Sequence, residues 1–321
     1  MSQAAHSKIV IIGVGQVGAT FAFALMPTGL AREIVLIDLN RQRAEGEAMD
    51  LNHGLSLAKP VSIYAGTYAD CKDADIMVIT AGANQKKGET RIDLLQRNVA
   101  VFRSIIEAIK PYFHEHTILL PVTNPVDILS YVTYQLSGLP FQRVIGSGTV
   151  LDSSRLRYLI SEHCRVNARN VHAYIIGEHG DSELAMWSHA DIGGVNVKQY
   201  CDGCTLNHCC ENKEMEFQKI FEEVKNAAYK IIAAKGATYY AIALSLVAIV
   251  EAILRDENGV LPVSTLIHDY HEIEEVYLSM PSIVNRHGVR QFLKLALSSD
   301  EALQLKNSAK KLKEILKAIG F

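Results

Sequence analysis

The stretch KIVIIGVGQVG at residues 8–18 decides the fold of this chain. A run of four β-branched apolar residues, 9–12, predicts a buried strand, and glycines spaced as Gly-x-Gly-x-x-Gly follow it at once. In a strand–turn–helix unit, Gly13 permits the tight turn, Gly15 lets the backbone approach a pyrophosphate, and Gly18 allows the helix to pack closely on the strand. The stretch predicts a dinucleotide site; the alternative is a glycine turn that only packs a helix.

An acidic residue at the end of the next strand favours the dinucleotide. Asp38 follows the apolar run 34–37 and lies 20 residues beyond Gly18, where a carboxylate would hydrogen-bond the adenosine ribose hydroxyls. The same charge would repel the additional phosphate of NADP, and no basic residue immediately follows it, although Arg41 and Arg43 lie close. We therefore expect NAD.

Short apolar runs alternate with helical patterns as far as residue 146, which is typical of parallel strands joined by crossover helices. Six runs predict strands: Ile9–Ile12, Ile34–Ile37, Val61–Tyr64, Ile76–Ile79, Ile118–Leu120 and Val144–Ile145. After Gly148 longer helices dominate, and Leu303 belongs to a set of apolar residues at helical spacing near the C-terminus. We expect an α/β protein: an N-terminal Rossmann domain with a doubly wound parallel sheet at residues 1–146, and a C-terminal α+β substrate domain at residues 147–321.

Charge and hydropathy exclude several classes of protein. The net charge is -3 and the basic residues are interspersed with acidic ones, so we expect no nucleic-acid partner. The apolar stretch at residues 241–250 is shorter than the roughly 20 residues that span a bilayer, and it predicts a buried helix. The polar N-terminus leaves no room for a secretory signal. We expect no membrane association and a cytoplasmic protein.

Four of the six cysteines gather at Cys201, Cys204, Cys209 and Cys210, beside His208. Zinc binds these residue types, but structural zinc sites usually combine two separated pairs, whereas these residues lie within 10 positions. The alternatives are a metal site and a loop of reduced thiols, and cytosolic redox conditions favour the thiols. We therefore assign no metal.

Two further segments carry residues suited to proton transfer and anion binding. Asp152 and Arg155 lie three residues apart at the start of a predicted helix, and His179 lies in the loop 177–181 after an apolar strand. Taken singly, an Asp–Arg pair at this spacing is usually a surface ion pair, and a loop histidine is often solvated. Together they offer an acid–base group, a partner that orients it and a cation for a carboxylate.

With these segments in this order, the chain resembles the lactate and malate dehydrogenase family over nearly its whole length. The resemblance rests on the glycine turn, on Thr123-Asn124-Pro125, on residues 151–155 and on residues 177–181. It implies reversible hydride transfer between NADH and pyruvate, giving L-lactate and NAD, in fermentative glycolysis. These are expectations from the family, not from composition or spacing.

The resemblance also implies a role for each matching residue. His179 would donate and accept the proton, Asp152 would fix its tautomer and favour the imidazolium, and Arg155 would grip the substrate carboxylate. Arg91, in a segment 82–95 that closes as a lid in the family, would polarise the reacting carbonyl. The other residues of the substrate pocket would be Gln85, Asn124 and Thr238. The cofactor-binding residues would be Gly13, Gly15, Val17, Gly18, Asp38, Thr80, Gly82 and Asn124.

The lid also bears on the choice of substrate. Malate enzymes of this family have an arginine at the position that is Gln85 here. A neutral amide offers no counter-charge, so oxaloacetate would bury a second carboxylate at a cost of about a few kcal/mol. Pyruvate and L-lactate are the expected substrates, and malate dehydrogenase is the alternative because Lys86 or Lys87 could supply the cation.

Arg157 and His172 lie where fructose 1,6-bisphosphate binds between subunits in the allosteric bacterial enzymes that this chain resembles. The resemblance implies this activator and a homotetramer, and the alternative is two ordinary surface side chains. Two other kinds of protein are less consistent with the sequence. An NAD-using glycosidase needs a metal near the nicotinamide, and a non-catalytic NAD-binding module leaves Asp152, Arg155 and His179 unexplained.

Overall fold

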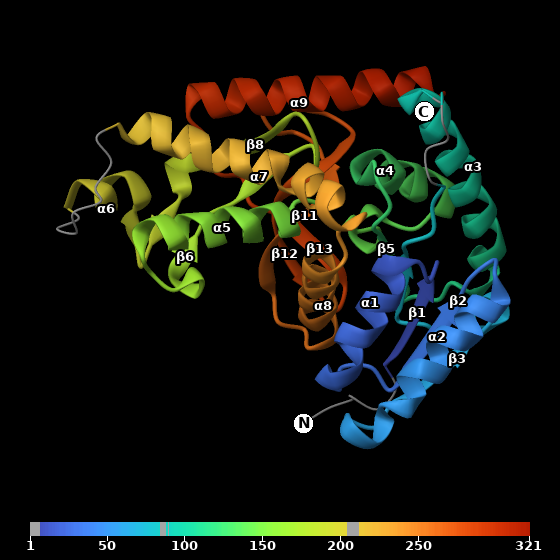
Figure 1. The fold of residues 1–321 in the computed structure, drawn as a ribbon. Coiled ribbons are helices and arrows are strands. Elements are labelled where there is room, and N and C mark those ends of the chain that lie inside the picture. Colours follow the sequence, from blue (N-terminus) through green and yellow to red (C-terminus); the bar gives the residue numbers. More distant parts are fainter. Residues whose placement is uncertain (1–6, 84–87, 89, 204–211) are drawn as a thin grey trace.

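The first half of the chain forms a parallel sheet with helices on both faces (Figure 1). The computed structural model describes residues 7–83, 88, 90–203 and 212–321. Five parallel strands follow the order β3-β2-β1-β4-β5. Their bounds are Lys8–Ile12 (β1), Glu33–Ile37 (β2), Ser62–Ala65 (β3), Ile76–Ile79 (β4) and Ile118–Pro121 (β5).

Alternate residues of each strand pack against helices on opposite faces of this sheet. Ile9 of β1 belongs to the same core cluster as Phe21, whereas Val10 lies in the cluster of Phe102. The helices α1 and α2 cover the first face, and α3 and α4 cover the second. Because both faces are covered, the central strands are mostly apolar: β4 is buried throughout, and β1 and β2 are buried beyond their first residues, Lys8 and Glu33. The bounds are Gln16–Leu25 (α1), Arg41–His53 (α2), Arg91–Ile109 (α3) and Val126–Ser137 (α4). The predicted doubly wound sheet is confirmed.

The expected sixth strand is a single bridge. Val144 forms one isolated parallel bridge with Leu119, whereas Gly146 pairs antiparallel with Ser264 of β11 (Gly259–Ile267). Gly146 N donates to Ser264 O at 2.9 Å, and Ser264 N donates to Gly146 O at 3.0 Å. The chain therefore leaves the first sheet for the second at this point, and the prediction of a sixth strand was wrong.

The second half combines antiparallel strands with long helices, as an α+β domain should. One sheet has the order β11-β12-β7-β8, with β13 paired to β12, and a smaller sheet has the order β10-β9-β6. The other strands are Val171–His172 (β6), Ile175–Gly177 (β7), Glu183–Ala185 (β8), Asp191–Ile192 (β9), Val195–Asn196 (β10), Val276–Asn285 (β12) and Gly288–Phe292 (β13). The helices are Val150–Cys164 (α5), Val197–Gly203 (α6), Lys213–Lys235 (α7), Tyr240–Leu254 (α8) and Ser299–Ala318 (α9).

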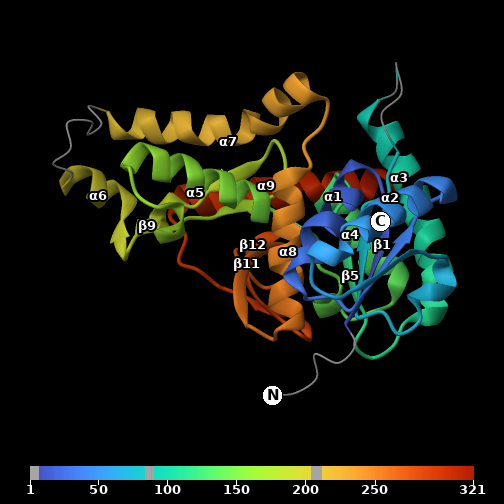
Figure 2. The ribbon, with the colours of Figure 1, turned by 60° about the horizontal axis from the view of Figure 1, so that its bottom comes forward.

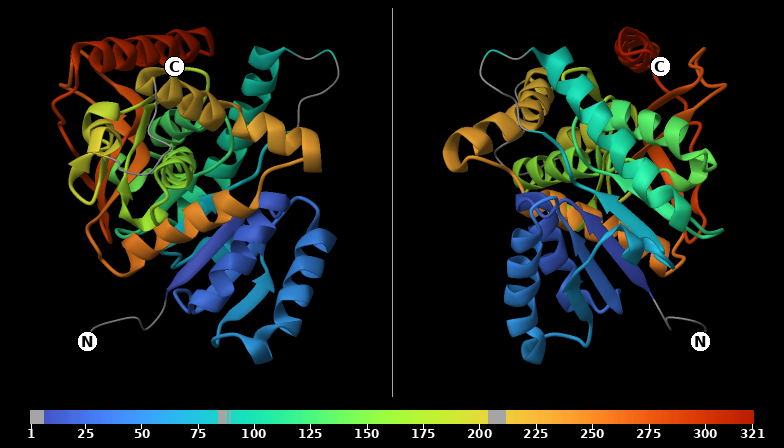
Figure 3. Two further views of the ribbon diagram at one scale, coloured as in Figure 1. Left: turned by 60° about the vertical axis from the view of Figure 1, so that its left-hand side comes forward. Right: turned by 90° about the vertical axis from the view of Figure 1, so that its right-hand side faces the viewer.

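The two halves share their hydrophobic cores. In Figures 2 and 3, α8 runs beside α1, and Leu246 of α8 lies in the same buried cluster as Ile9 of β1. On the other face of the sheet, Leu312 of α9 belongs to the cluster of Val10. The halves are thus joined by continuous apolar packing, which fixes the position of one relative to the other.

Two apolar helices are less buried than their sequences suggest. In α8, Leu246 and Ile249 are fully buried but Leu244 is 64% exposed, so the expected buried helix has one open face. In α9, Leu312 is buried, but Leu303 of the apolar set predicted from helical spacing is 57% exposed. Among the described residues, no helix has both the length and the apolarity of a membrane span.

The glycine turn gives a stability test with an internal control. A Cβ at Gly18 would lie 2.1 Å from the carbonyl oxygen of Gly13, so we expect Gly18→Ala to lower the free energy of unfolding by about 1–3 kcal/mol. At Gly46 in α2 no atom lies within 4 Å of the added Cβ, so Gly46→Ala should raise stability by about 0.5–1 kcal/mol. Urea unfolding measures both, and equal stabilities would contradict the packing described.

Candidate active site

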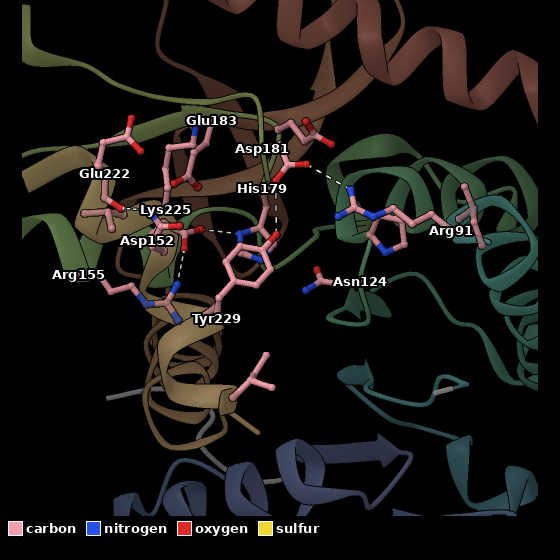
Figure 4. Close-up of a pocket in the computed structure, with 18 of the residues that line it drawn as sticks. Arg91, Asn124, Asp152, Arg155, His179, Asp181, Glu183, Glu222, Lys225 and Tyr229 are labelled. Atoms are coloured by element: carbon pink, nitrogen blue, oxygen red, sulfur yellow. Dashed lines mark hydrogen bonds and ion pairs between the residues drawn. The ribbon is translucent and has the colours of Figure 1, made fainter. Parts of the chain in front are cut away.

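A cavity of about 580 Å³ lies where the two halves meet, and a second of about 240 Å³ shares part of its wall. Both are lined by Asn124, Arg155 and His179. Figure 4 shows these side chains converging from α5, from the loop after β7 and from the first half of the chain. The cavities therefore join the predicted cofactor side to the predicted proton-transfer side.

The glycine turn has the geometry that a dinucleotide requires. Gly13 has φ +97°, a conformation that L side chains rarely adopt, and no atom lies within 4 Å of the Cβ position of Gly15. The open side of Gly15 lets a pyrophosphate approach the helix N-terminus. Asp38 accepts hydrogen bonds from Val14 N and Asn40 N, both at 2.9 Å, which hold its carboxylate beside the turn.

The two arginines near Asp38 form ion pairs with glutamates of α2. Arg41 Nε lies 2.8 Å from Glu45 and Arg43 Nε lies 3.9 Å from Glu47, each one helical turn along α2. These pairs leave no uncompensated cation for the additional phosphate of NADP. The geometry fits NAD.

The smaller cavity brings the predicted cofactor and substrate residues together. Val17 and Thr80 line it from the first half, and Thr238 lines it from the second. Thr80 Oγ1 donates to Gly13 O at 2.5 Å, which ties β4 to the glycine turn. Gly82 packs on Thr123, since a Cβ there would lie 2.4 Å from Thr123 Cγ2. Gln85, Lys86 and Lys87 lie outside the described residues.

Asp152, Arg155 and His179 form a charged triad around the buried carboxylate of Asp152. His179 Nδ1 lies 2.5 Å from Asp152 Oδ2, and Arg155 Nη1 lies 2.8 Å from Asp152 Oδ1. The side chain of Asp152 is 3% exposed and that of Arg155 is 14% exposed. The alternative of a surface ion pair is therefore wrong. With Nδ1 held by Asp152, Nε2 is the nitrogen of His179 that is left for a ligand.

The charges of this triad support one another. Burial opposes ionisation of Asp152, but His179 and Arg155 outweigh it and lower the pKa of the carboxyl. Burial likewise opposes the imidazolium, but Asp152 overrides it and raises the pKa of His179 to about 9. At neutral pH the pair is thus an imidazolium and a carboxylate, ready to donate a proton.

Asp127 is a site residue that the sequence analysis missed. Its Oδ2 accepts from the backbone N of His179 at 2.7 Å, and its Oδ1 accepts from Ser264 Oγ at 2.6 Å. Burial raises the pKa of Asp127 to about 6 despite these bonds. The side chain positions the histidine from α4. An acidic residue in the apolar first turn of α4 was the signal.

The C-terminal helix α9 holds the same loop and was also missed. Lys311 Nζ lies 2.9 Å from Glu178 Oε2, and Ser308 Oγ accepts from Glu178 N at 2.8 Å. Ser182 donates to the same Glu178 carboxylate. Residues 178–182 are therefore fixed from α4, α5 and α9 at once. Nothing local in the sequence links Lys311 to Glu178, which lies 133 residues away.

Glu183 is the third acidic group beside the histidine. It opens β8, is 7% exposed, and its carboxylate lies within 4.8 Å of the ligand atoms of Asp152 and His179. Burial, and then repulsion by Asp152, raise the pKa of Glu183 to about 8. These groups have metal-binding residue types, but His179 Nδ1 and Asp152 Oδ2 are only 2.5 Å apart. That is closer than two ligands approach around one ion with bonds of about 2.0–2.2 Å.

Arg91 lies at the mouth of the larger cavity and not beside His179. It is the first residue of α3, its side chain is 82% exposed, and its Nη1 lies 3.3 Å from Asp181 Oδ2. Tyr229 Oη donates to Asp181 Oδ1 at 3.5 Å from the opposite wall (Figure 4). Asp181 thus holds Arg91 at the rim, one loop away from the triad.

Arg157 and His172 lie near one another on the second half. Arg157 Nε donates to Ala173 O at 3.0 Å, next to the exposed His172, and its guanidinium lies 5.0 Å from the centroid of the Tyr174 ring. Of the cysteine group, Cys201 is buried in α6. The others, Cys204, Cys209 and Cys210, lie outside the described residues with His208.

Comparison with known proteins matches both halves. The model of the lactate/malate dehydrogenase NAD binding domain matches residues 7–146, and that of the lactate/malate dehydrogenase alpha/beta C-terminal domain matches residues 149–320. The chain belongs to the lactate/malate dehydrogenase family. The NAD-binding assignment of residues 7–146 agrees with the turn at Gly13 and with Asp38.

Relatives of this family match the whole chain. The L-lactate dehydrogenase of Acetivibrio thermocellus is 55% identical over 314 residues, covering 98% of each chain. L-lactate dehydrogenase 1 of Clostridium acetobutylicum is 51% identical, covering 98% of this chain and 99% of that one. The crystal structure of the lactate dehydrogenase MGS-M5, from a deep-sea metagenome library, is 45% identical with a TM-score of 0.94, covering 98% and 99%. That of the minor L-lactate dehydrogenase of Enterococcus mundtii is 42% identical with a TM-score of 0.92, covering 98% of each.

The triad can be tested through the histidine itself. We expect Asp152→Asn to lower the pKa of His179 from about 9 toward its ordinary value of 6.5, because the amide keeps the shape of the carboxylate and loses its charge. Diethyl pyrocarbonate acylates neutral imidazole, so its reaction with His179, followed by mass spectrometry, should accelerate near neutral pH. Asp50→Asn, on the exposed side of α2, is the control. An unchanged pH midpoint in Asp152→Asn would refute the coupling.

Proposed function

We propose that this chain is an NAD-dependent L-lactate dehydrogenase that interconverts pyruvate and L-lactate. The observation that carries the proposal is the buried Asp152–His179 couple with Arg155, in a cavity that reaches the dinucleotide turn. The full-length relatives support lactate over malate as the hydroxy acid, because they are L-lactate dehydrogenases. We assign residues 1–146 to the NAD-binding domain and residues 147–321 to the substrate domain.

The side chains of the cavity can carry out each step of pyruvate reduction. Arg155 binds the carboxylate with its planar guanidinium, and the imidazolium of His179 donates its Nε2 proton to the carbonyl oxygen. Asp152 stabilises the imidazolium before the transfer and fixes the neutral tautomer after it. Bound NADH supplies the hydride for the carbonyl carbon. In the reverse direction, neutral His179 takes the hydroxyl proton of L-lactate.

The remaining assigned residues complete the pocket. Asn124 and Thr238 line the smaller cavity on the cofactor side. Arg91 is assigned to polarise the carbonyl, which requires its side chain to leave Asp181 and move toward His179. The cofactor-binding residues are Gly13, Gly15, Val17, Gly18, Asp38, Thr80, Gly82 and Asn124.

NADH oxidation with pyruvate and with oxaloacetate tests this function directly. We expect a clear preference for pyruvate, and we expect His179→Asn to lower turnover by about 10²–10⁴-fold, because the asparagine cannot exchange a proton. NADH binding, measured by fluorescence, should persist in the variant. Near-normal turnover of His179→Asn would refute the assignment, and a preference for oxaloacetate would indicate that Lys86 or Lys87 pairs the second carboxylate.

The choice of substrate is assigned to Gln85. We expect Gln85→Arg to shift the ratio of kcat/KM values from pyruvate toward oxaloacetate by about 10-fold or more, because the guanidinium supplies the missing counter-charge. The measurement is kcat/KM for both acids in both proteins. Gln96→Arg, an exposed position in α3, adds the same charge away from the lid. An unchanged ratio in Gln85→Arg would contradict this assignment.

We also propose a homotetramer activated by fructose 1,6-bisphosphate, acting in the cytoplasm in fermentative glycolysis. Apolar side chains exposed on α1, α2 and α8 support association of chains: Phe23, Met49, Tyr240 and Leu244. The proximity of Arg157 and His172 supports an anion site on the second half. A ligand bound across such an interface would couple association to activity.

The activator site is tested by charge removal. We expect Arg157→Gln to raise the fructose 1,6-bisphosphate concentration needed for half-maximal activation by about 10-fold or more, because one cation for the phosphates is lost. Arg169→Gln, a nearby exposed arginine, is the matched control. Activation curves followed by NADH oxidation give the result. Activation that is unaltered in Arg157→Gln would rule out this residue.

A further inference from the structure

Glu183 has no role in the reaction described above, yet it lies against the catalytic couple. Figure 4 shows it beside Asp152 and Lys225, on the wall of the larger cavity. Only 7% of the residue is exposed, and one of its carboxylate oxygens lies within 4.8 Å of a carboxylate oxygen of Asp152 and of a ring nitrogen of His179. A second carboxylate so close to Asp152 is costly unless a proton or a cation compensates it.

With Asp152 ionised, the charges of Asp152, Arg155, His179 and Glu183 balance in two ways. Asp152 and Arg155 form an ion pair and cancel each other. If His179 is an imidazolium, an ionised Glu183 makes the cluster neutral; if His179 is neutral, a protonated Glu183 does the same. The other two protonation states of His179 and Glu183 leave a net charge on these four groups, which is unfavourable where water has little access. His179 and Glu183 together therefore favour holding one proton between them.

Two surrounding charges favour the state in which His179 is an imidazolium and Glu183 is ionised, and the others are paired or lie on the exposed part of the wall. From α7, Lys225 favours the ionised form of Glu183, and Glu222 lies farther out on the same wall. From the loop after β7, Glu178 is paired with Lys311 and Asp181 with Arg91.

The remaining neighbour is on α4. Asp127 accepts hydrogen bonds from Ser264 and from the backbone of His179. Its charge favours the imidazolium and so acts in the same direction as that of Asp152.

We propose that Glu183 is a positioning residue for the catalytic proton and shares one proton with His179. Glu183 is ionised while His179 is an imidazolium, and Glu183 is protonated while His179 is neutral. Above the pKa of about 8 that burial gives Glu183, the carboxylate is ionised and takes one proton from solvent when His179 Nε2 gives its proton to the carbonyl oxygen of pyruvate. When L-lactate is oxidised and His179 gains the hydroxyl proton, Glu183 releases one to water. One solvent proton is consumed per pyruvate reduced, as the reaction requires, and the summed charge of His179 and Glu183 stays constant.

The inference rests on the proposed role of His179, and the pH dependence of kcat/KM for pyruvate at saturating NADH tests it. In the wild-type enzyme we expect activity to fall with rising pH through two ionisations. In Glu183→Gln, whose amide keeps the shape but holds neither charge nor proton, we expect a single ionisation. Its midpoint should lie lower by about one pH unit, because the imidazolium has lost a neighbouring carboxylate.

Two further variants separate this role from a structural one. Glu183→Asp keeps a carboxylate and should keep the two ionisations. Glu222→Gln removes a carboxylate farther out on the cavity wall and should leave the midpoint unchanged. A purely structural role for Glu183 predicts a lower plateau with an unmoved midpoint in Glu183→Gln, and that result would overturn the proposal.

A measurement on the unaltered enzyme covers the case in which Glu183→Gln does not fold. The rate at which diethyl pyrocarbonate modifies His179 in the NADH complex reports the neutral imidazole, and it should rise with pH in two steps. A single step would overturn the sharing of the proton. A wrong assignment of the function would give a different result, namely near-normal turnover in His179→Asn.

Discussion

The hydrogen bond between Asp152 and His179 is the interaction on which the rest of the site depends. Two ionisable groups lie together with little exposure to water, and the charge of each favours the charged form of the other. Such a pair needs its geometry fixed from several sides. Helix α5 supplies the carboxylate, α4 holds the backbone of the histidine through Asp127, and α9 holds the neighbouring Glu178 through Lys311.

The same constraint explains why the two halves are joined by continuous cores. The glycine turn belongs to the first sheet, and Asp152 and His179 belong to the second half. Hydride transfer and proton transfer to the same substrate therefore need a fixed distance between the two halves. Helix α8 packs on α1, and α9 packs into the core on the opposite face of the first sheet. The cavities then lie at the junction, lined from both sides by residues such as Thr80 and Arg155.

The sequence predicted the parts of the site whose residues lie close together along the chain. The strand and glycines around Gly13, the acid at Asp38, and the i, i+3 pair of Asp152 and Arg155 each occupy a short segment whose spacing has a physical meaning. Asp127 and Lys311 were missed because their partners are distant in sequence, and only the folded chain brings them together. A strand was predicted at Val144, where the structure has a single bridge. An apolar run indicates a buried segment, but it does not indicate which sheet the segment joins.

The anchoring of residues 178–182 by α9 has a consequence for how the enzyme is made. A nascent chain emerges from the ribosome N-terminal part first, and its early segments begin to fold before synthesis ends. The first sheet is complete by residue 121, long before Ser308 and Lys311 are translated. The glycine turn is therefore synthesised long before the side chains that anchor the proton donor, and the loop of His179 gains its final order only when the end of the chain has been made.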